Sequence, residues 1–141
     1  MGGDSCMQKK ILWIEDAALM LGGLVRPLEK SGHQIITVQN EKEALKALDK
    51  ENFDLILFDI IIPSGSDGDD YIEYVGARLA DEIVNKRNLK TPIIGISVVT
   101  RPDIINNLYK LGFKKIFLKG HLRPTQLKDE VEKIFNCEAR T

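Results

Sequence analysis

Short apolar runs alternate along the chain with longer segments in which apolar residues recur at helical spacing. A run of four or five mostly apolar residues, bounded by polar residues, is typical of a strand buried on both faces of a parallel sheet. Such runs occupy residues 10–14, 34–38, 55–58, 93–96 and 115–118. Because a helical pattern follows each run and crossovers between parallel strands are right-handed, the sequence predicts an α/β fold: a doubly wound, five-stranded parallel sheet with five helices.

Several residues mark where the helices begin and end. The first helix is predicted over residues 18–30, with a kink at Pro27, and Gly32 is expected to end it in a left-handed conformation. Asn40 is expected to cap the second helix, because Glu43 three residues later completes a capping-box pattern. The later helices are predicted from near Gly76 (or, alternatively, from a cap at Asp69 or Asp70) to Lys86, from a Thr100 cap to Gly112, and from near Pro124 onward.

Polar residues follow four of the predicted strands, at the end where open parallel sheets bind ligands. Glu15 and Asp16 follow the first strand, Asp59 the third, Ser97 the fourth and Lys119 the fifth. Carboxylates, a hydroxyl and an amine should therefore meet at one edge of the sheet. Carboxylate oxygens suit magnesium, which binds through few protein ligands and leaves room for phosphate oxygens. The set predicts a site for a divalent metal and a phosphoryl group.

With these residues in this order, the chain resembles the receiver domain of two-component response regulators. The resemblance covers about residues 9–135. It rests on the acidic pair after the first strand, a proline four residues after the central aspartate, and a lysine 22 positions after the serine: Glu15, Asp16, Asp59, Pro63, Ser97 and Lys119. The resemblance implies a flavodoxin-like receiver fold with strand order 2-1-3-4-5.

The resemblance also implies a role for each site residue. Asp59 is the expected nucleophile, because a carboxylate can attack phosphorus and form an acyl phosphate. Ser97 and Lys119 are expected to bind the phosphoryl oxygens, the first through its hydroxyl and the second through its charge. Mg²⁺ is the implied cofactor, and its ligands are expected to be the side chains of Glu15, Asp16 and Asp59 and the backbone carbonyl of Ile61.

The implied function is that of a phosphorelay receiver. Such a domain accepts a phosphoryl group on Asp59 from a histidine kinase or a phosphotransfer protein and signals through a conformational change. It is a self-phosphorylating phosphoacceptor rather than a turnover enzyme. The downstream protein partner is not indicated by the sequence.

Three positions depart from the family. Ile116 stands where an aromatic residue is usual, Gly120 where proline is usual, and Val98 where a small side chain is usual. Of these, Ile116 and Val98 favour an alternative, a degenerate receiver that acts as an interaction module without phosphorylation, whereas the complete set of acids, serine and lysine opposes it. A flavodoxin-like cofactor-binding domain is a third hypothesis, but residues 17–19 offer no glycine-rich phosphate loop.

Length, charge and composition limit the domain organisation, the partners and the location of the protein. The 141 residues predict a single domain over residues 9–136, with a disordered leader or cloning remnant at 1–8 and a frayed tail at 137–141. The net charge is −1 and no basic stripe stands out, so direct nucleic-acid binding is not expected. No apolar run reaches membrane-spanning length and no signal peptide precedes the first strand, which predicts a cytoplasmic protein without a membrane partner. Cys6 and Cys137 are expected to be reduced surface thiols.

Overall fold

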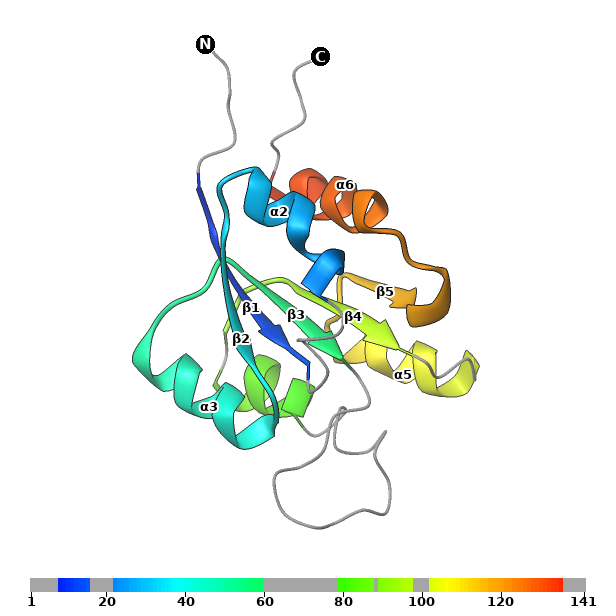
Figure 1. Cartoon of the computed structure of the whole chain (residues 1–141). Coiled ribbons are helices and arrows are strands. Elements are labelled where there is room, and N and C mark those ends of the chain that lie inside the picture. Colours follow the sequence, from blue (N-terminus) through cyan, green and yellow to red (C-terminus); the bar gives the residue numbers. More distant parts are fainter. Residues whose placement is uncertain (1–7, 16–21, 60–78, 88, 98–101, 136–141) are drawn as a thin grey trace.

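The computed structural model describes residues 8–15, 22–59, 79–87, 89–97 and 102–135, apart from the side chains of Asp103, Ile104, Asn107 and Lys119. These residues form a five-stranded sheet with helices on both faces (Figure 1). Its strands are β1 (Lys10–Ile14), β2 (Gln34–Val38), β3 (Leu55–Asp59), β4 (Ile93–Ser97) and β5 (Lys115–Leu118). Each lies where an apolar run predicted it, β3 ends at Asp59 as expected, and β4 extends one residue further at its carboxyl end, to Ser97.

The strand order across the sheet is β2-β1-β3-β4-β5. All neighbouring strands are parallel, so the predicted fold class and order are confirmed. Every residue of β3 and β4 is buried, which explains why these two segments are continuous apolar runs rather than alternating ones. The edge strands β2 and β5 are more exposed.

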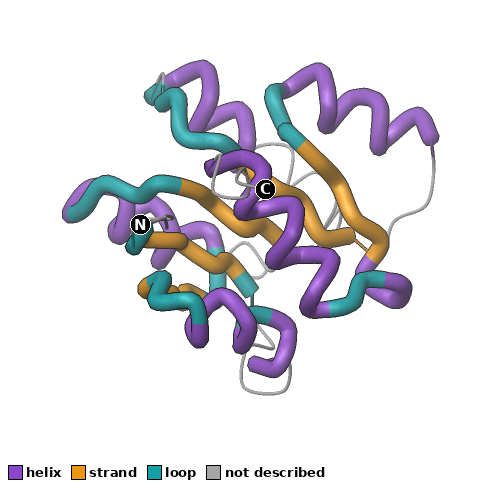
Figure 2. The backbone as a smooth tube through the Cα atoms, turned by 90° about the horizontal axis from the view of Figure 1, so that it is seen from above, coloured by secondary structure: helices purple, strands orange, loops and turns teal. Residues whose placement is uncertain are grey.

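Five helices cover the sheet within the described residues: α2 (Arg26–Lys30), α3 (Glu41–Lys50), a segment over residues 79–86 that ends in the π-helix η2 (Glu82–Lys86), α5 (Pro102–Leu111) and α6 (Pro124–Phe135). Two short 3₁₀ turns, η1 (Gly22–Leu24) and η3 (Lys119–His121), accompany them. Helices α2 and α6 cover one face, and α3, residues 79–86 and α5 cover the other (Figure 1). Seen from above, α6 lies over the strands (Figure 2). None of these helices is both long and apolar enough to cross a bilayer.

The core has two halves, one on each face of the sheet. Alternate residues of β1 point in opposite directions, so Leu12 and Ile14 join the half under α3, residues 79–86 and α5. Ile11 and Trp13 join the half under α2 and α6. Burial of a large apolar side chain of this kind stabilises a fold by about 1.5–3 kcal/mol. The two halves together fix the sheet between its helices.

The first helix differs from the prediction. Within the described residues, η1 ends at Leu24 and the α-helix begins only at Arg26. Pro27 lies in the first turn of α2, where its missing N–H removes no intrahelical hydrogen bond. The expectation of a continuous helix over residues 18–30 with a kink at Pro27 was therefore wrong, because proline starts this helix instead of bending it.

The predicted helix ends are confirmed where the structure describes them. The Asn40 side chain accepts a hydrogen bond from the Glu43 N–H at 2.9 Å, as expected for a cap of α3. The Glu43 carboxylate accepts one from the Gln39 N–H at 3.0 Å. Gly32 after α2 and Gly112 after α5 adopt positive φ angles of 99° and 119°, which a residue with a Cβ rarely adopts.

The segment before β4 ends in a π-helical turn. The Arg87 N–H donates to the carbonyl of Glu82 at 2.8 Å, a bond that spans five residues instead of four. Arg87 also forms ion pairs with Asp49 at 2.6 Å and with Glu82 at 3.4 Å, and it thereby ties η2 to α3. The hydrogen bond to Asp49 raises the pKa of Arg87 further. The helix ends at Lys86 as predicted, whereas its expected start at Gly76, Asp69 or Asp70 lies outside the described residues.

A buried histidine joins three elements at the amino-terminal edge of the sheet. His33 precedes β2 and is 4% exposed. Its Nδ1 accepts a hydrogen bond from the Lys9 N–H at 3.2 Å, and its ring lies 5.7 Å from the ring of Phe135 in α6. Burial lowers the pKa of His33. The nearby charges partly cancel, since carboxylates raise this pKa and lysines lower it: Glu132, Lys128, Lys9 and Asp54.

We expect the free energy of unfolding to fall as the pH drops below the ordinary histidine pKa of 6.5. Below this pH the histidine of the unfolded chain becomes protonated, whereas His33 in the folded chain stays neutral because its pKa is lower. The contribution of neutral His33 to stability is therefore complete above the unfolded pKa and decreases as the pH falls toward the folded pKa. Urea unfolding at about pH 7.5 and about pH 5.5 would measure the loss. His33→Gln should reduce the pH dependence, and the exposed control His121→Gln should leave it unchanged. Equal behaviour of the two variants would contradict this account.

Candidate functional site

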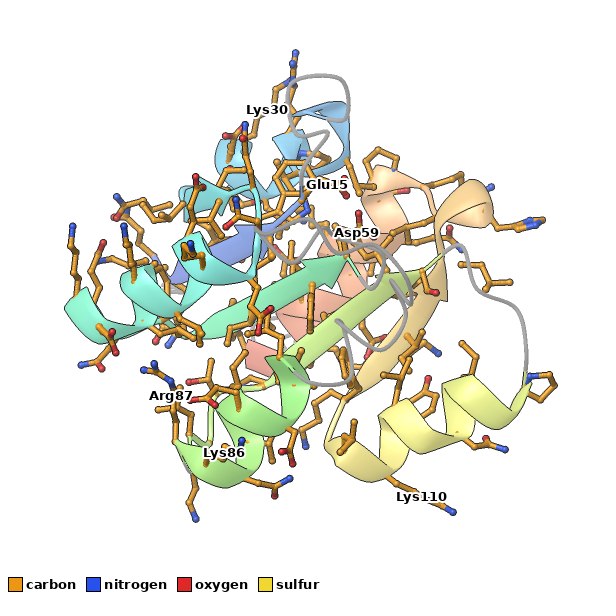
Figure 3. All side chains as sticks on the ribbon, turned by 90° about the horizontal axis from the view of Figure 1, so that it is seen from below. Glu15, Lys30, Asp59, Lys86, Arg87 and Lys110 are labelled. Carbon is orange, nitrogen blue, oxygen red and sulfur yellow. The ribbon has the colours of Figure 1, made fainter. Side chains whose placement is uncertain are left out.

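Two buried carboxylates lie beside each other at the carboxyl ends of β1 and β3. Glu15 is 0% exposed and Asp59 is 1% exposed. Ile14 pairs with Phe58, so Glu15 and Asp59 are the next residues in the same strand register. The Glu15 N–H donates to the carbonyl of Val38 at 2.9 Å, which fixes the end of β1 against β2. Figure 3 shows both side chains at this edge. The sheet itself therefore brings the two acids together.

The same register leads to the other predicted site residues. Asp59 pairs with Ile96, and Ser97 follows Ile96 as the fully buried last residue of β4. Ser97 in turn pairs with Leu118, and Lys119 follows Leu118 as the first residue of η3. The structure thus places Ser97, and the backbone of Lys119, at the same edge as the carboxylates. The Lys119 side chain is not among the described parts of the chain.

Two predicted metal ligands lie outside the described residues: Asp16 and Ile61. Val98, the Thr100 cap, Cys6 and Cys137 also lie outside them. Within the described residues, no group of three or more acidic, histidine or cysteine side chains is close enough to hold a metal ion. Glu15 and Asp59 are two of the three carboxylates that the sequence assigned to the site, and Asp16 directly follows Glu15.

The chemistry of this pair fits magnesium. Burial of two neighbouring carboxylates is unfavourable while both are charged, because each loses water and each repels the other. A divalent cation offsets both terms. Magnesium is compatible with such a pair, since it binds through one or two carboxylates and fills its other positions with water and phosphate oxygens. Ser97, whose side chain carries a hydroxyl, is fully buried at the same edge.

An aromatic residue that no sequence pattern had indicated lies next to one of the atypical positions. Ile116 packs against the core beneath α5, and its N–H donates to the hydroxyl of Tyr109 at 3.0 Å. Tyr109 lies on α5 and is 40% exposed. The Tyr109 side chain therefore lies beside Ile116 of the edge strand β5, although Tyr109 belongs to the preceding helix α5. The second atypical residue, Gly120, lies exposed in η3, and the described residues contain no cis peptide bond.

The order of the strands, the two buried acids and the strand-end serine agree with one protein family. A family model of the response regulator receiver domain matches residues 11–132. The chain belongs to this family. The matched residues include β1 to β5 almost entirely, so the receiver domain accounts for the whole sheet. The resemblance inferred from the sequence is confirmed.

Relatives and solved structures agree with this assignment. The transcriptional regulatory protein CrdR of Helicobacter pylori is 29% identical over 130 residues, which are 92% of this chain and 56% of CrdR. The nisin biosynthesis regulatory protein NisR of Lactococcus lactis is 35% identical over 103 residues, 72% of this chain and 40% of NisR. The crystal structure of a response regulator from Thermotoga maritima shares the fold with a TM-score of 0.77 at 23% identity, covering 92% of this chain and 99% of that one.

The receiver domain spans about half the length of the curated relatives that it matches, at 56% of CrdR and 40% of NisR. These matches concern the receiver domain and do not extend to the rest of those proteins. They also do not favour the alternative of an interaction module that works without phosphorylation.

Proposed function

We propose that this receiver domain accepts a phosphoryl group on Asp59 in a magnesium-dependent reaction. The observation that carries the proposal is the burial of Asp59 beside Glu15 at the carboxyl edge of the sheet, with Ser97 buried at the end of the neighbouring strand. Receiver domains as a family interact with histidine kinases or phosphotransfer proteins. We therefore expect the donor to be a phosphohistidine on such a partner.

In the proposed reaction, an oxygen of the Asp59 carboxylate attacks phosphorus in line with the leaving histidine nitrogen. The new oxygen–phosphorus bond forms as the phosphorus–nitrogen bond breaks, and the nitrogen keeps the electron pair. The result is an acyl phosphate on Asp59. Because Asp59 is 1% exposed, the residues around it limit the access of bulk water to its carboxylate.

Other residues of the chain would orient the transferred group. The Ser97 hydroxyl would donate to a phosphoryl oxygen, and Lys119 would add a positive charge there. Glu15, Asp16, Asp59 and the Ile61 carbonyl would hold the metal. When bound, magnesium would neutralise the charge that makes an anionic donor and a carboxylate repel each other. Each of these groups would either hold the phosphoryl group in place or neutralise its negative charge, and positioning and charge stabilisation are most of what phosphoryl transfer requires.

We place the conformational output of this reaction on α5 and β5. The chain passes from Ser97 through residues 98–101 into α5, so a movement of Ser97 toward the phosphoryl group has a short path to that helix. The hydrogen bond from the Ile116 N–H to the Tyr109 hydroxyl then links α5 to β5. The proposal keeps the expectation of one receiver domain over residues 9–136 that works in the cytoplasm.

Incubation with acetyl phosphate tests the proposal. We expect the intact mass to rise by one phosphoryl group per chain in the presence of magnesium, because the charge on the acids must be offset before an anionic donor can approach. Chelation of the metal before the donor is added should prevent the gain. An adduct that forms equally well without magnesium, or the absence of any adduct, would contradict the proposed reaction.

A further inference from the structure

Charge is unevenly distributed along this nearly neutral chain. Residues 83–128 contain ten basic residues and one acidic residue, whereas the rest of the chain contains ten basic and twenty acidic residues. The net charge of −1 hides this difference. The expectation that no basic stripe stands out therefore does not hold for this segment. Residues 83–128 run from η2 through β4, α5, β5 and η3 into the start of α6, so most of this positive charge lies at the β4–β5 side of the sheet.

Five lysines of this segment lie around two adjacent connections, one leading into β4 and the other into β5. We call them the basic edge: Lys86, Lys90, Lys110, Lys114 and Lys115. Two contacts show that the connections are neighbours. The Lys114 N–H donates to the carbonyl of Ile93 at 2.8 Å, and Lys115 pairs with Ile94. Gly112, which follows α5, also lies close to Val84 of η2, since a Cβ at this position would be 3.3 Å from the Val84 side chain.

The basic edge lies away from the phosphorylation pocket. Lys90 precedes the start of β4, and Lys114 and Lys115 are at the start of β5. Asp59 and Ser97 lie at the opposite, carboxyl ends of their strands. Figure 3 shows Lys86 and Lys110 on the same side of the molecule, at the ends of neighbouring helices and remote from Glu15 and Asp59. A molecule bound at the basic edge would therefore leave the pocket accessible to a kinase.

These lysines are not neutralised within the described part of the chain. No ion pair joins any of them to an acidic side chain there. Lys86, Lys90, Lys110 and Lys114 are exposed. Lys115 is half-buried, with its ammonium group 5.6 Å from the ring centre of Phe117. The nearest arginine, Arg87, differs from them, since Asp49 and Glu82 already bind it.

Helix electrostatics explain only part of this cluster. Lys86 and Lys110 lie in the last turns of η2 and α5, where a positive charge favourably opposes the negative end of the helix dipole. Lys90, Lys114 and Lys115 lie outside the helices and have no such role. Exposed like charges also repel one another, and at Lys90, Lys114 and Lys115 no helix dipole offsets this repulsion. A binding function would explain the three lysines that the helix dipoles do not explain.

We propose that the basic edge binds an acidic segment of a partner protein. Lysine ammonium groups on flexible stems are strongly hydrated point charges, and they match carboxylates whose spacing is not fixed. Recognition of nucleic-acid phosphates commonly combines lysine charge with bidentate arginine forks and helix amino termini. At the basic edge Arg87 is already paired, and η2 and α5 both present their carboxyl ends. The contact is electrostatic, fast and sensitive to salt.

The test measures binding of a fluorescent oligoglutamate peptide to the whole chain at low ionic strength. We expect the charge-reversal pair Lys90→Glu with Lys114→Glu to weaken binding about tenfold or more, since close charge pairs contribute strongly to such complexes. The matched control is Lys42→Glu with Lys46→Glu on α3, which reverses two exposed lysines and changes the net charge equally. It should bind within about twofold of the wild type. Added salt should weaken binding to all three proteins.

Several results would overturn the proposal. They are failure of the wild type to bind the peptide, an equal loss in the control pair, and tighter binding of short duplex DNA than of oligoglutamate. Amide shifts of the wild type on titration with the peptide give a readout that needs no variant. We expect them at the basic edge, and shifts confined to the Asp59 pocket would reject it. Should the reversal pair fail to fold, Lys90→Gln with Lys114→Gln serves as the milder substitution.

Discussion

Replacement of Glu15 by glutamine should slow magnesium-dependent phosphorylation of Asp59 by about a hundredfold or more, equivalent to roughly 2.7 kcal/mol in the barrier. Glu15 is fully buried. It directly follows Ile14, which pairs with Phe58, and Asp59 directly follows Phe58, so Glu15 is the closest described acid to Asp59 in the sheet register. The substitution keeps the size of the side chain and removes its charge. It therefore weakens the binding of the metal without changing the shape of the pocket.

The same substitution should not destabilise the metal-free domain. Two neighbouring buried carboxylates repel each other in the absence of a cation, and glutamine removes that repulsion. We expect the melting temperature without metal to stay level or to rise by a few degrees, about what 1 kcal/mol produces in a domain of this size. Stability and activity thus move in opposite directions, as is common for residues retained for function.

The exposed control for this experiment is Glu29→Gln on α2, which should leave both the rate and the melting temperature unchanged. Rates are best compared by the appearance of the phosphorylated mass over time at saturating donor. A Glu15→Gln variant that is phosphorylated as fast as the wild type would exclude Glu15 from the site. A variant that loses activity together with its folded structure would show that Glu15 serves the fold instead.

Replacement of Phe58 by alanine should cost about 3–5 kcal/mol of folding free energy. Phe58 is fully buried in the half of the core beneath α3 and α5, and its ring stacks on Phe113 with the centres 5.8 Å apart. Truncation of Phe58 leaves a cavity between β3 and Phe113, which precedes β5, and the rigid sheet cannot close this cavity. Domains are stable by only about 5–15 kcal/mol, so most of the margin would disappear.

Urea unfolding at constant pH measures this loss. Phe58→Leu, which keeps most of the volume, should cost less than about 1.5 kcal/mol. Leu118→Ala is a surface control, since Leu118 is 39% exposed, and it should change the free energy by no more than about 0.5 kcal/mol. Equal costs for Phe58→Ala and Leu118→Ala would contradict the packing described for this half of the core.

The strands could be predicted from the sequence because both faces of the sheet are covered. A strand such as β3 then reads as an uninterrupted apolar run, and its ends are marked by Asp54 and Asp59. The first helix could not be predicted with the same success. Its apolar stripe suggested one long helix, but local backbone preferences prevailed, and Pro27 set the start of α2. Periodicity shows which face a helix buries, whereas the ends depend on single residues.

The candidate site was predictable to the extent that strand ends determine it. Parallel pairing brings the residue after each strand to one edge, so Glu15, Asp59 and Ser97 could be grouped without a structure. Contacts between distant side chains and backbone could not be inferred. The bond from Ile116 to Tyr109 and the burial of His33 against α6 depend on how the helices pack. The basic edge escaped notice because its lysines come from two separate connections.

The proposed function depends most directly on which residue carries the phosphoryl group. Wild type, Asp59→Asn and Asp54→Asn should each be incubated with acetyl phosphate and magnesium, and their intact masses compared. Asp54 is the matched control, because it is an exposed aspartate immediately before β3, the strand that Asp59 ends, and asparagine can still accept its hydrogen bond from the Lys10 N–H. We expect one phosphoryl group on the wild type and on Asp54→Asn, and none on Asp59→Asn. An Asp59→Asn protein that gains the same mass as the wild type would contradict the proposed function.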